Sequence, residues 1–437
     1  MDVNSMPFRS LTDYEVQNEF QSARACCLEK LTNNGFANFI RDQNHILDDH
    51  ESPNTCKYYD IDTFNGTFVQ TKGIISIFHM NVRRLAKHKG EFLAFLSTLT
   101  LSFDIIILTE IGNDANHHIN EHFLPDFKCF YSLPKGNKYG GTAIFIKNSI
   151  GPVTLRPDLS IDSSCTCDKC NVEDSWVELQ VNNEVYIIAG IYRHPNGNVN
   201  HFVSSLEKAL TKIPEHANCV IAGDMNIDLI NYNNPTCFEY FTTLSSFDYL
   251  PYIITPTRIT DNTATIIDHI FIKMAKSNKN SIINSGNLFC DISDHLPNFA
   301  IIENMTPRNN KQKRPLIRIF SEKKNIEAFR EDLSNSKWEE IIANTDAELC
   351  YQDFYRHVCQ LYEKNFPLVR LSRKRSKDKK WITAGIRNSI NHKDKLYKKQ
   401  LQKPTPNNIQ TYKSYKKYPN IMYSKFGSKL FQGTANR

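Results

Sequence analysis

Short, continuous apolar runs recur between residues 73 and 303 of this 437-residue chain, and they restrict its possible folds more than any other feature. Apolar runs of about four to eight residues are typical of strands that are buried on both faces of a sheet. In chain order the runs are IISIFHMNV, DIIILTEI, TAIFIKNSI, WVELQV, VYIIAGIY, CVIAGDMNI, TIIDHIFI and NFAII. Because such a sheet needs helices to cover it, the runs predict a layered α/β domain.

Segments with helical periodicity lie between some of these runs. The apolar residues of the first are Leu85, Phe92, Leu93, Phe95, Leu96 and Leu99, and those of the second are Phe202, Val203, Leu206, Leu210 and Ile213. In each segment they recur at the spacing of one helix face. Strands that alternate with amphipathic helices support the α/β class.

The composition changes along the chain and predicts four regions. Residues 1–72 are polar and weakly periodic and form an N-terminal extension that the sequence leaves unassigned. Residues 73–303 are the α/β domain, and 304–369 are a mostly helical linker region containing EAFREDLSNSKWEEII and CYQDFYRHVCQLYEKNF. Residues 370–437 form a smaller basic tail, in which KKWITAGIRNSINHKDKLYKKQL has the pattern of a helix.

Positive charge is concentrated in the tail. Residues 370–437 hold 19 Lys and Arg residues against two acids, Asp378 and Asp394, which gives +17. The whole chain is +6, so residues 1–369 carry −11. A basic tail on an acidic body favours a polyanion such as nucleic acid as partner. A solvated tail without a partner would explain the same charge.

Targeting and redox signals are few. The N-terminal MDVNSMPFRSLTDYEV lacks the apolar region of a secretory signal, and no apolar run approaches the roughly 20 residues of a membrane helix. The twelve cysteines show no framework, which is typical of reduced intracellular thiols. Cys165, Cys167 and Cys170 crowd one loop, where they would either share a zinc ion with a ligand from elsewhere or lie in a variable hairpin.

Polar residues at the ends of the strands are the strongest functional signal. Buried carboxylates, amides and imidazoles are costly unless they are paired, protonated or bound to metal, and strand ends are where layered α/β folds assemble sites. The residues are Asn81, Glu110, Tyr192, Asp224, Asn226, Asp268, Asp294 and His295. Any one of them alone would be explained as a turn or cap residue, whereas the whole set indicates a site.

Four further histidines also fall near strand ends. They are His117, His118, His194 and His269. Histidines at such positions are more often surface or loop residues than ligands, so we leave them out of the predicted site.

Three of the strand-end residues are oxygen ligands. Glu110, Asn81 and Asp294 suit a hard cation such as Mg²⁺, with Mn²⁺ as the alternative, better than zinc. We therefore expect a divalent metal site.

The other five have the chemistry of phosphoester hydrolysis. Asp268 can orient the His295 imidazole, and Asp224 can accept a proton from a water that Asn226 positions. Tyr192 can donate a hydrogen bond to the phosphate or to the leaving oxygen. Together with a metal, these residues predict metal-assisted hydrolysis of a phosphoester.

Eight motifs in one order carry a resemblance to a known family. They are MNV, LTE, GGTAIFI, IYRHPN, GDMNID, TRIT, IDHIF and SDHLP, and they extend over residues 73–303. The chain resembles the endonuclease/exonuclease/phosphatase superfamily and, within it, the apurinic-type endonuclease of LINE-type (non-LTR) retrotransposons. The resemblance implies a four-layered sandwich of two β-sheets flanked by helices, here followed by a smaller helical basic region.

The resemblance also implies roles for the matching residues. Glu110 would be the principal metal ligand, with Asn81 and Asp294 nearby. The pair Asp224 and Asn226 would activate and position water, and Tyr192 with the Asp268–His295 pair would bind the scissile phosphate. Such enzymes nick DNA to leave a 3′-hydroxyl, which primes reverse transcription in a retrotransposon.

The family implies further expectations for this chain. The segment KKWITAGIRNSINHKDKLYKKQ is similar to the connector that precedes reverse transcriptase in such elements, and no polymerase-like pair of aspartates follows it. We therefore expect a truncated element product, a domesticated fragment or an incomplete reading frame. DNA is the expected target, the element RNA a candidate partner, and the nucleus the expected location.

Two other functions fit parts of the sequence. The same fold would serve a phosphoesterase that acts on a phosphoinositide or sphingomyelin headgroup, although no membrane-binding helix is evident. A non-enzymatic fragment could instead bind nucleic acid through residues 370–437.

Overall fold

The computed structural model describes residues 56–70, 73–119, 123–134, 139–161, 171–260, 263–278, 281–303, 316–318, 323–339, 346–370 and 382–417. The chain divides into two compact units. The sandwich unit comprises Met1–Asn309 and Trp381–Arg437, and the helical unit comprises Asn310–Lys380.

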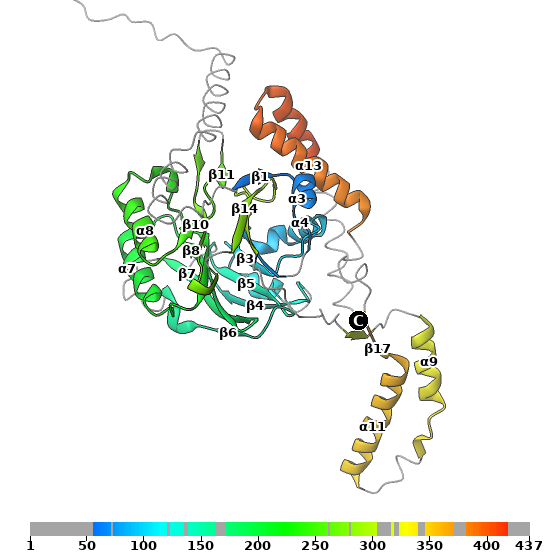
Figure 1. The fold of residues 1–437 in the computed structure, drawn as a ribbon. Coiled ribbons are helices and arrows are strands. Elements are labelled where there is room, and N and C mark those ends of the chain that lie inside the picture. Colours follow the sequence, from blue (N-terminus) through cyan, green and yellow to red (C-terminus); the bar gives the residue numbers. More distant parts are fainter. Residues whose placement is uncertain are drawn as a thin grey trace, which may run out of the picture. The chain divides into compact units, whose positions relative to one another are not determined.

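Two large mixed sheets form the centre of the sandwich unit (Figure 1). In spatial order, the seven-stranded sheet contains β1 (Lys57–Tyr59), β14 (Ile282–Leu288), β15 (Asn298–Glu303), β2 (Ile74–Asn81), β3 (Ile105–Thr109), β5 (Thr142–Lys147) and β4 (Phe127–Ser132). The six-stranded sheet contains β10 (Leu250–Pro251), β13 (Asp268–Lys273), β9 (Asn218–Asp224), β8 (Glu184–Arg193), β7 (Val172–Val181) and β6 (Val153–Leu155). A short hairpin of β11 (Arg258–Ile259) and β12 (Ala264–Thr265) stands apart from both.

Helices cover the outer faces of the two sheets, which confirms the predicted α/β sandwich of two sheets flanked by helices. The helices α3 (Ile61–Thr67) and α4 (Leu85–Thr98) lie on the side of the seven-stranded sheet, and α7 (Val199–Leu210) and α8 (Pro235–Ser246) lie on the other side (Figure 1). Shorter turns are α5 (Ala115–His118), η1 (Pro157–Leu159), η2 (Leu229–Asn231) and η3 (Lys276–Asn278).

The apolar runs form strands that are buried on both faces, as their composition predicts. Ile77 and Ile107 pack in the cluster between the sheets, whereas the next residue of β2, Phe78, packs against Phe92 and Phe95 of α4. Because successive side chains of a strand point to opposite faces, each run must be apolar throughout.

Residues from the N-terminal stretch that the sequence left unassigned belong to the sandwich. β1 pairs in parallel with β14, and Tyr59 and Phe64 pack edge-on against Phe299 of β15. A three-residue strand is too short to show a pattern in the sequence. Residues 1–55 and 71–72 lie outside the described residues.

Part of the basic tail also packs on the sandwich unit. The helix expected there is α13 (Ala384–Gln402), and residues 406–417 form another helix after it. Ile386 and Ile390 of α13 join the cluster that contains Phe92 of α4, and Tyr397 and Tyr412 join a cluster with Phe289 and Leu296. Apolar residues inside a basic segment thus attach these helices to the fold.

A buried group of charges accompanies this packing. Lys393, Asp394 and Asp291 are almost fully buried, and Lys393 Nζ lies 3.7 Å from Asp394 Oδ1 and 4.0 Å from Asp291 Oδ2. Lys416 Nζ lies 2.9 Å from Asp291 Oδ1. Burial, aided by the charge of Asp291, raises the pKa of Asp394 to about 7 although Lys393 opposes it.

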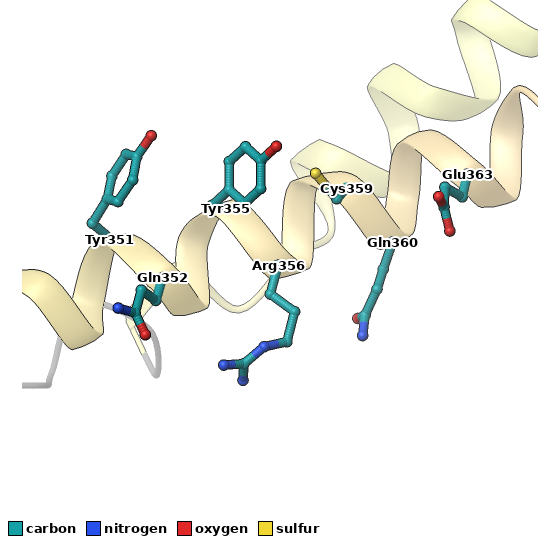
Figure 2. A pocket seen from close by; sticks show the side chains of 7 residues that line it. All are labelled: Tyr351, Gln352, Tyr355, Arg356, Cys359, Gln360 and Glu363. Atoms are coloured by element: carbon teal, nitrogen blue, oxygen red, sulfur yellow. The ribbon is translucent and has the colours of Figure 1, made fainter.

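The helical unit contains two helices and a two-stranded sheet. The helices are α9 (Lys323–Ser334) and α11 (Ala347–Asn365), and β16 (Leu316–Arg318) pairs with β17 (Leu368–Arg370) in antiparallel register. Phe329 and Phe366 contact each other edge-on. α11 also exposes Tyr351 and Tyr355, which line a pocket along the helix (Figure 2).

Two sequence-based expectations concern cysteines and membranes. The seven described cysteines are free, and Cys165, Cys167 and Cys170 lie outside the described residues. Within the part of the chain that the structure describes, no helix combines the length and the apolar composition that crossing a bilayer requires.

Lys393→Met tests whether the buried charges hold the tail helix on the sandwich unit. Removal of one partner of a buried ion pair costs about 3–5 kcal/mol, here because Asp394 loses the cation beside it while Asp291 keeps only Lys416. We expect a loss of this size in the free energy of unfolding, measured by urea titration. The control is Lys395→Met, whose pair with Asp62 is more than half exposed; its effect should stay below about 1 kcal/mol. Equal effects of the two substitutions would contradict this account.

Candidate active site

Four strands of the six-stranded sheet place a polar residue on the same row. Glu173 of β7 pairs with Tyr192 of β8, Tyr192 pairs with Asp224 of β9, and Asp224 pairs with Asp268 of β13. Residues in register across a sheet point to the same face. Gly190, two residues before Tyr192, faces Ile107 and Ile144 of the other sheet. The row therefore lies at one end of the space between the two sheets.

The seven-stranded sheet brings its own polar residues to this row. Asn81 ends β2, and its side-chain nitrogen donates to Glu110 Oε1 at 2.9 Å and to Asp224 Oδ2 at 2.8 Å. Glu110 follows β3 and has a φ of 51°, a conformation that costs a non-glycine residue energy and is concentrated at functional sites. Asn81 thus links acids from both sheets.

His295 reaches the row from the loop between β14 and β15. Its Nδ1 lies 2.9 Å from Asp268 Oδ2, 3.1 Å from Asp268 Oδ1 and 4.0 Å from Asp224 Oδ2. The Ser293 hydroxyl donates to the carbonyl oxygen of Asn81 at 2.7 Å and accepts from the His295 backbone N–H at 3.2 Å. The loop is therefore fastened to the end of β2.

The charges of these buried groups determine one another. Burial disfavours a charged imidazole, yet the carboxylates of Asp268 and Asp224 outweigh it and raise the pKa of His295 to about 9. Burial also opposes the ionised form of Asp268, but the charge and the hydrogen bond of His295 hold its pKa below the usual range. Burial and the negative charge of Asp268 raise the pKa of Asp224 to about 7, although His295 opposes this.

Neutral groups complete the hydrogen bonds of Asp268. The Thr257 hydroxyl donates to Asp268 Oδ2 at 2.6 Å and accepts from the Asp268 backbone N–H at 3.1 Å. Asn298 donates to the Asp268 carbonyl oxygen at 3.3 Å, and the His79 ring lies between Asn298 and Thr109. Burial lowers the pKa of His79 to about 4, so its ring is neutral. His79 and Asn298 were missed in the sequence, where their only signal was a polar residue at an apolar run, and Thr257 was recognised only as part of the TRIT motif.

Asn226 lies beside Asp224 in a tight turn. Its backbone N–H donates to Asp224 Oδ1 at 3.1 Å, and its φ is 47°. Its side-chain nitrogen donates to the carbonyl oxygen of Arg193 at 2.7 Å. The buried guanidinium of Arg193 in turn donates to the carbonyl oxygens of Met225, Asn226 and Gly197. Arg193 therefore fixes the turn that carries Asn226.

Tyr192 lies deep in the site. Burial, followed by the negative charges of Glu110 and Asp224, keeps the pKa of its hydroxyl above the ordinary value, so it is a hydrogen-bond donor. Its ring meets the ring of His194 edge-on at 4.8 Å.

His194, which we left out of the predicted site, lies in the loop after β8, where its ring packs against Tyr192 and pairs with Glu173. His194 Nε2 lies 3.0 Å from both carboxylate oxygens of Glu173, and the Gly141 N–H donates to Glu173 at 3.3 Å. A Cβ on Gly140 would come within 2.9 Å of Glu173 Oε2. The pair of glycines in GGTAIFI was the sequence signal for this close approach.

The other three histidines lie away from the acids. His269 is also buried, contrary to expectation, because its ring bonds to the Tyr240 hydroxyl and to the Ile266 carbonyl oxygen. His117 is exposed and His118 is partly exposed.

Asp294 faces two arginines. Arg83 Nη1 lies 2.8 Å from its Oδ1, and Arg258 Nε lies 2.9 Å from its Oδ2. Burial opposes ionisation, but His295 and these two arginines lower the pKa of Asp294. The structure thus places Asp294 at the rim of the site, against cations.

The buried acids suit a cation. Ligand atoms of Asp224, Asp268 and His295 all lie within 4.8 Å of one another, the spacing of a metal-binding cluster. Glu110, Asp224 and Asp268 supply three carboxylates, whereas His295 is the only buried cation bonded to them among the described residues. Burial first, and then the negative charge of Asp268, raises the pKa of Asp224, and a nearby divalent ion would favour the ionised form of this carboxyl group.

Comparisons with known proteins identify the family. The model of the Endonuclease/Exonuclease/phosphatase family matches residues 79–295, whereas no curated protein matches the chain. The solved structures that are similar over about half of the chain include the following three.

The first is the endonuclease domain of TRAS1, a telomere-specific non-LTR retrotransposon (14% identity, 53% of this chain, 100% of that chain, TM-score 0.40). The second is D. rerio TDP2 complexed with a single-strand DNA product (14% identity, 52% of this chain, 98% of that chain, TM-score 0.39). The third is the 3′-5′ exonuclease NExo from Neisseria meningitidis (16% identity, 52% of this chain, 98% of that chain, TM-score 0.39). The family model confirms the predicted superfamily: over residues 79–295 the chain belongs to the endonuclease/exonuclease/phosphatase family, whose members are generally hydrolytic phosphoesterases.

Proposed function

We propose that this protein is a divalent-metal-dependent endonuclease that nicks DNA and leaves a 3′-hydroxyl, as a non-LTR retrotransposon endonuclease does at its target site. The observation that carries the proposal is the buried set of Asp224, Asp268 and His295. The set combines a proton acceptor with a protonated imidazole, next to a surplus of carboxylates. Hydrolysis of a phosphodiester uses these elements together.

Glu110, Asn81 and Asp294 are the proposed residues for holding Mg²⁺ or Mn²⁺. Carboxylate and amide oxygens are the ligands that these ions prefer. When bound, the ion would stabilise the negative charge that develops on the phosphate and on the leaving oxygen.

The other side chains would act on the water and on the phosphate. Asp224 accepts a proton from the attacking water, and Asn226 beside it positions that water. Asp268 binds His295 Nδ1, so the opposite ring nitrogen of the imidazolium is free of this contact and donates to a phosphate oxygen. Tyr192 donates to the same phosphate. The new bond joins the water oxygen to phosphorus, and the bond to the 3′-oxygen breaks.

Two expectations follow from DNA as substrate. The protein would act in the nucleus, and RNA of the element remains a candidate partner. A substrate with a lipid headgroup is the competing possibility, and parallel assays on DNA and on lipid substrates distinguish the two.

His295→Ala and Asp224→Asn test the reaction. Each removes a proton-transferring or phosphate-binding group, and such groups contribute about 10²–10⁴-fold to rates. We expect the rate of conversion of supercoiled plasmid to open circles to fall by at least about 100-fold for each variant. His216→Ala, a change at an exposed histidine, should nick like the wild type. Robust nicking by His295→Ala would remove the site assignment.

Thermal unfolding in Mg²⁺ tests the metal ligands without reference to catalysis. Binding to the folded state stabilises it by about 2.7 kcal/mol at 100 times the Kd. The wild type should therefore show a rise in Tm with Mg²⁺ that EDTA reverses, and Glu110→Gln should lose most of it. Asp294→Asn shows separately whether Asp294 belongs to the ligand set. The control is Glu178→Gln, which alters a carboxylate bonded to Arg156 far along β7. An equal rise in all variants would contradict the assignment.

A further inference from the structure

Arg83 and Arg258 approach Asp294 from separate parts of the fold. Arg83 lies two residues after the end of β2, whereas Arg258 begins the β11–β12 hairpin. Each guanidinium contacts a different oxygen of the Asp294 carboxylate. The side chains of Arg83 and Arg258 are 50% and 35% exposed, so both are open to a ligand from solvent.

The backbone ties both arginines to the catalytic residues. The Arg83 N–H donates to Asn81 Oδ1 at 3.1 Å. Arg258 pairs with His295 in an isolated β-bridge, next to a hydrogen bond from Leu296 N–H to the Thr257 carbonyl oxygen at 2.7 Å. The two guanidiniums are therefore held at the rim of the row of buried acids.

Stability does not explain this arrangement. An exposed or half-exposed ion pair contributes little to the free energy of unfolding. Arg83 and Arg84 have φ values of 44° and 78°, and a positive φ destabilises a non-glycine residue. Two successive residues in this conformation outweigh the gain from the ion pairs, which points to a role in function.

The charges leave a positive rim. One carboxylate, Asp294, lies between two guanidiniums, so one positive charge remains in this group. The neighbouring Arg84 pairs with a different acid, Asp114, at 2.8 Å. Arg258 contacts Asp294 through Nε, and Arg83 contacts it through Nη1. The other N–H groups of each guanidinium take no part in that contact.

We propose that Arg83 and Arg258 form a phosphate-binding subsite that takes a backbone phosphate next to the scissile one, with Asp294 as the residue that positions both guanidiniums. The inference rests on the proposed function and specifies its substrate: a strand with at least two consecutive phosphates. Guanidinium groups bind phosphate oxygens through paired N–H donors, and a planar fork suits this better than a lysine.

A substrate with a single phosphodiester group would have nothing to place in this subsite. The subsite therefore separates two kinds of substrate, a DNA strand and a small diester such as bis(p-nitrophenyl) phosphate. Loss of the subsite should weaken DNA binding more than it slows the chemical step, because neither arginine contacts the Asp224, Asp268 and His295 side chains in the described structure.

The experiment compares wild type, Arg83→Ala, Arg258→Ala and the double variant on a labelled 20-base-pair duplex and on bis(p-nitrophenyl) phosphate. On DNA we expect KM to rise about tenfold for each single variant, equivalent to about 1.4 kcal/mol. The loss of kcat/KM on DNA should exceed the loss on the small diester by at least tenfold. Duplex binding in EDTA, followed by fluorescence anisotropy over a salt series, should lose about 0.9 of its log–log slope for each arginine removed.

The matched control is Arg156→Ala. Arg156 also pairs with two carboxylate side chains, Asp158 and Glu178, but it lies beside β6 and η1, away from the catalytic row. Its DNA KM and its salt slope should equal those of the wild type. Unfolding midpoints of all variants establish that each is folded.

The outcomes separate this inference from the proposed function. If the wild type nicks DNA and the arginine variants keep its KM and its salt slope, the subsite is refuted and the endonuclease stands. Equal losses of kcat/KM on DNA and on the small diester would also refute the subsite, because the arginines would then support the catalytic centre itself. If the wild type cleaves no DNA but its binding shows an arginine-dependent salt slope, the subsite stands and the proposed function falls.

Discussion

The buried pair of Asp268 and His295 joins the two sheets at the point where the site forms. Asp268 begins β13 of the six-stranded sheet, and His295 lies in the loop between two strands of the seven-stranded sheet. A buried ion pair is stable only when the remaining hydrogen-bonding groups are also satisfied. Thr257, Asn298 and Ser293 supply those bonds, and each comes from a different segment. The position of His295 therefore depends on the whole sandwich being assembled.

The register of the six-stranded sheet explains why distant residues meet. Tyr192 and Asp224 lie opposite each other because β8 and β9 are parallel and end at the same edge. Asp224 and Asp268 lie opposite each other because β9 and β13 are antiparallel, so that the end of one strand faces the start of the other. A slip of one residue in any of these strands would turn its polar side chain to the opposite face.

Sequence analysis could predict the strands and the polar residues at their ends because buried strands appear as apolar runs. It could not predict the Glu173–His194 pair, because that pair depends on the register between β7 and β8 and on the close approach of Gly140. β1 was missed because three residues carry no period. Thr257 was recognised only as part of a motif, since its hydrogen bonds to Asp268 follow from the hairpin geometry.

The charge of the tail shows a different limit of sequence analysis. Its lysines suggested a free basic arm, yet Lys393, Lys395, Lys398 and Lys416 pair with acids of the sandwich unit. A count of charges cannot distinguish lysines that are available to a polyanion from those that are neutralised within the fold. Two of the four pair with Asp291, which lies three residues before Asp294 in the same loop. The tail helices therefore support the loop that carries Asp294 and His295.

Burial of its acids would also let an acidic body accommodate the proposed DNA substrate. Residues 1–369 carry −11, but the most important acids of the site are buried, and their charge is balanced by His295 and, as we propose, by a metal ion. The exposed rim presents Arg83 and Arg258, whose charge exceeds that of Asp294. A ligand near the rim is affected mainly by the closest charges, since salt screens exposed charges that are more than about 10 Å away. A phosphate that approaches the rim would therefore meet positive charge first, and the proposed metal ion would balance the charge of the buried acids.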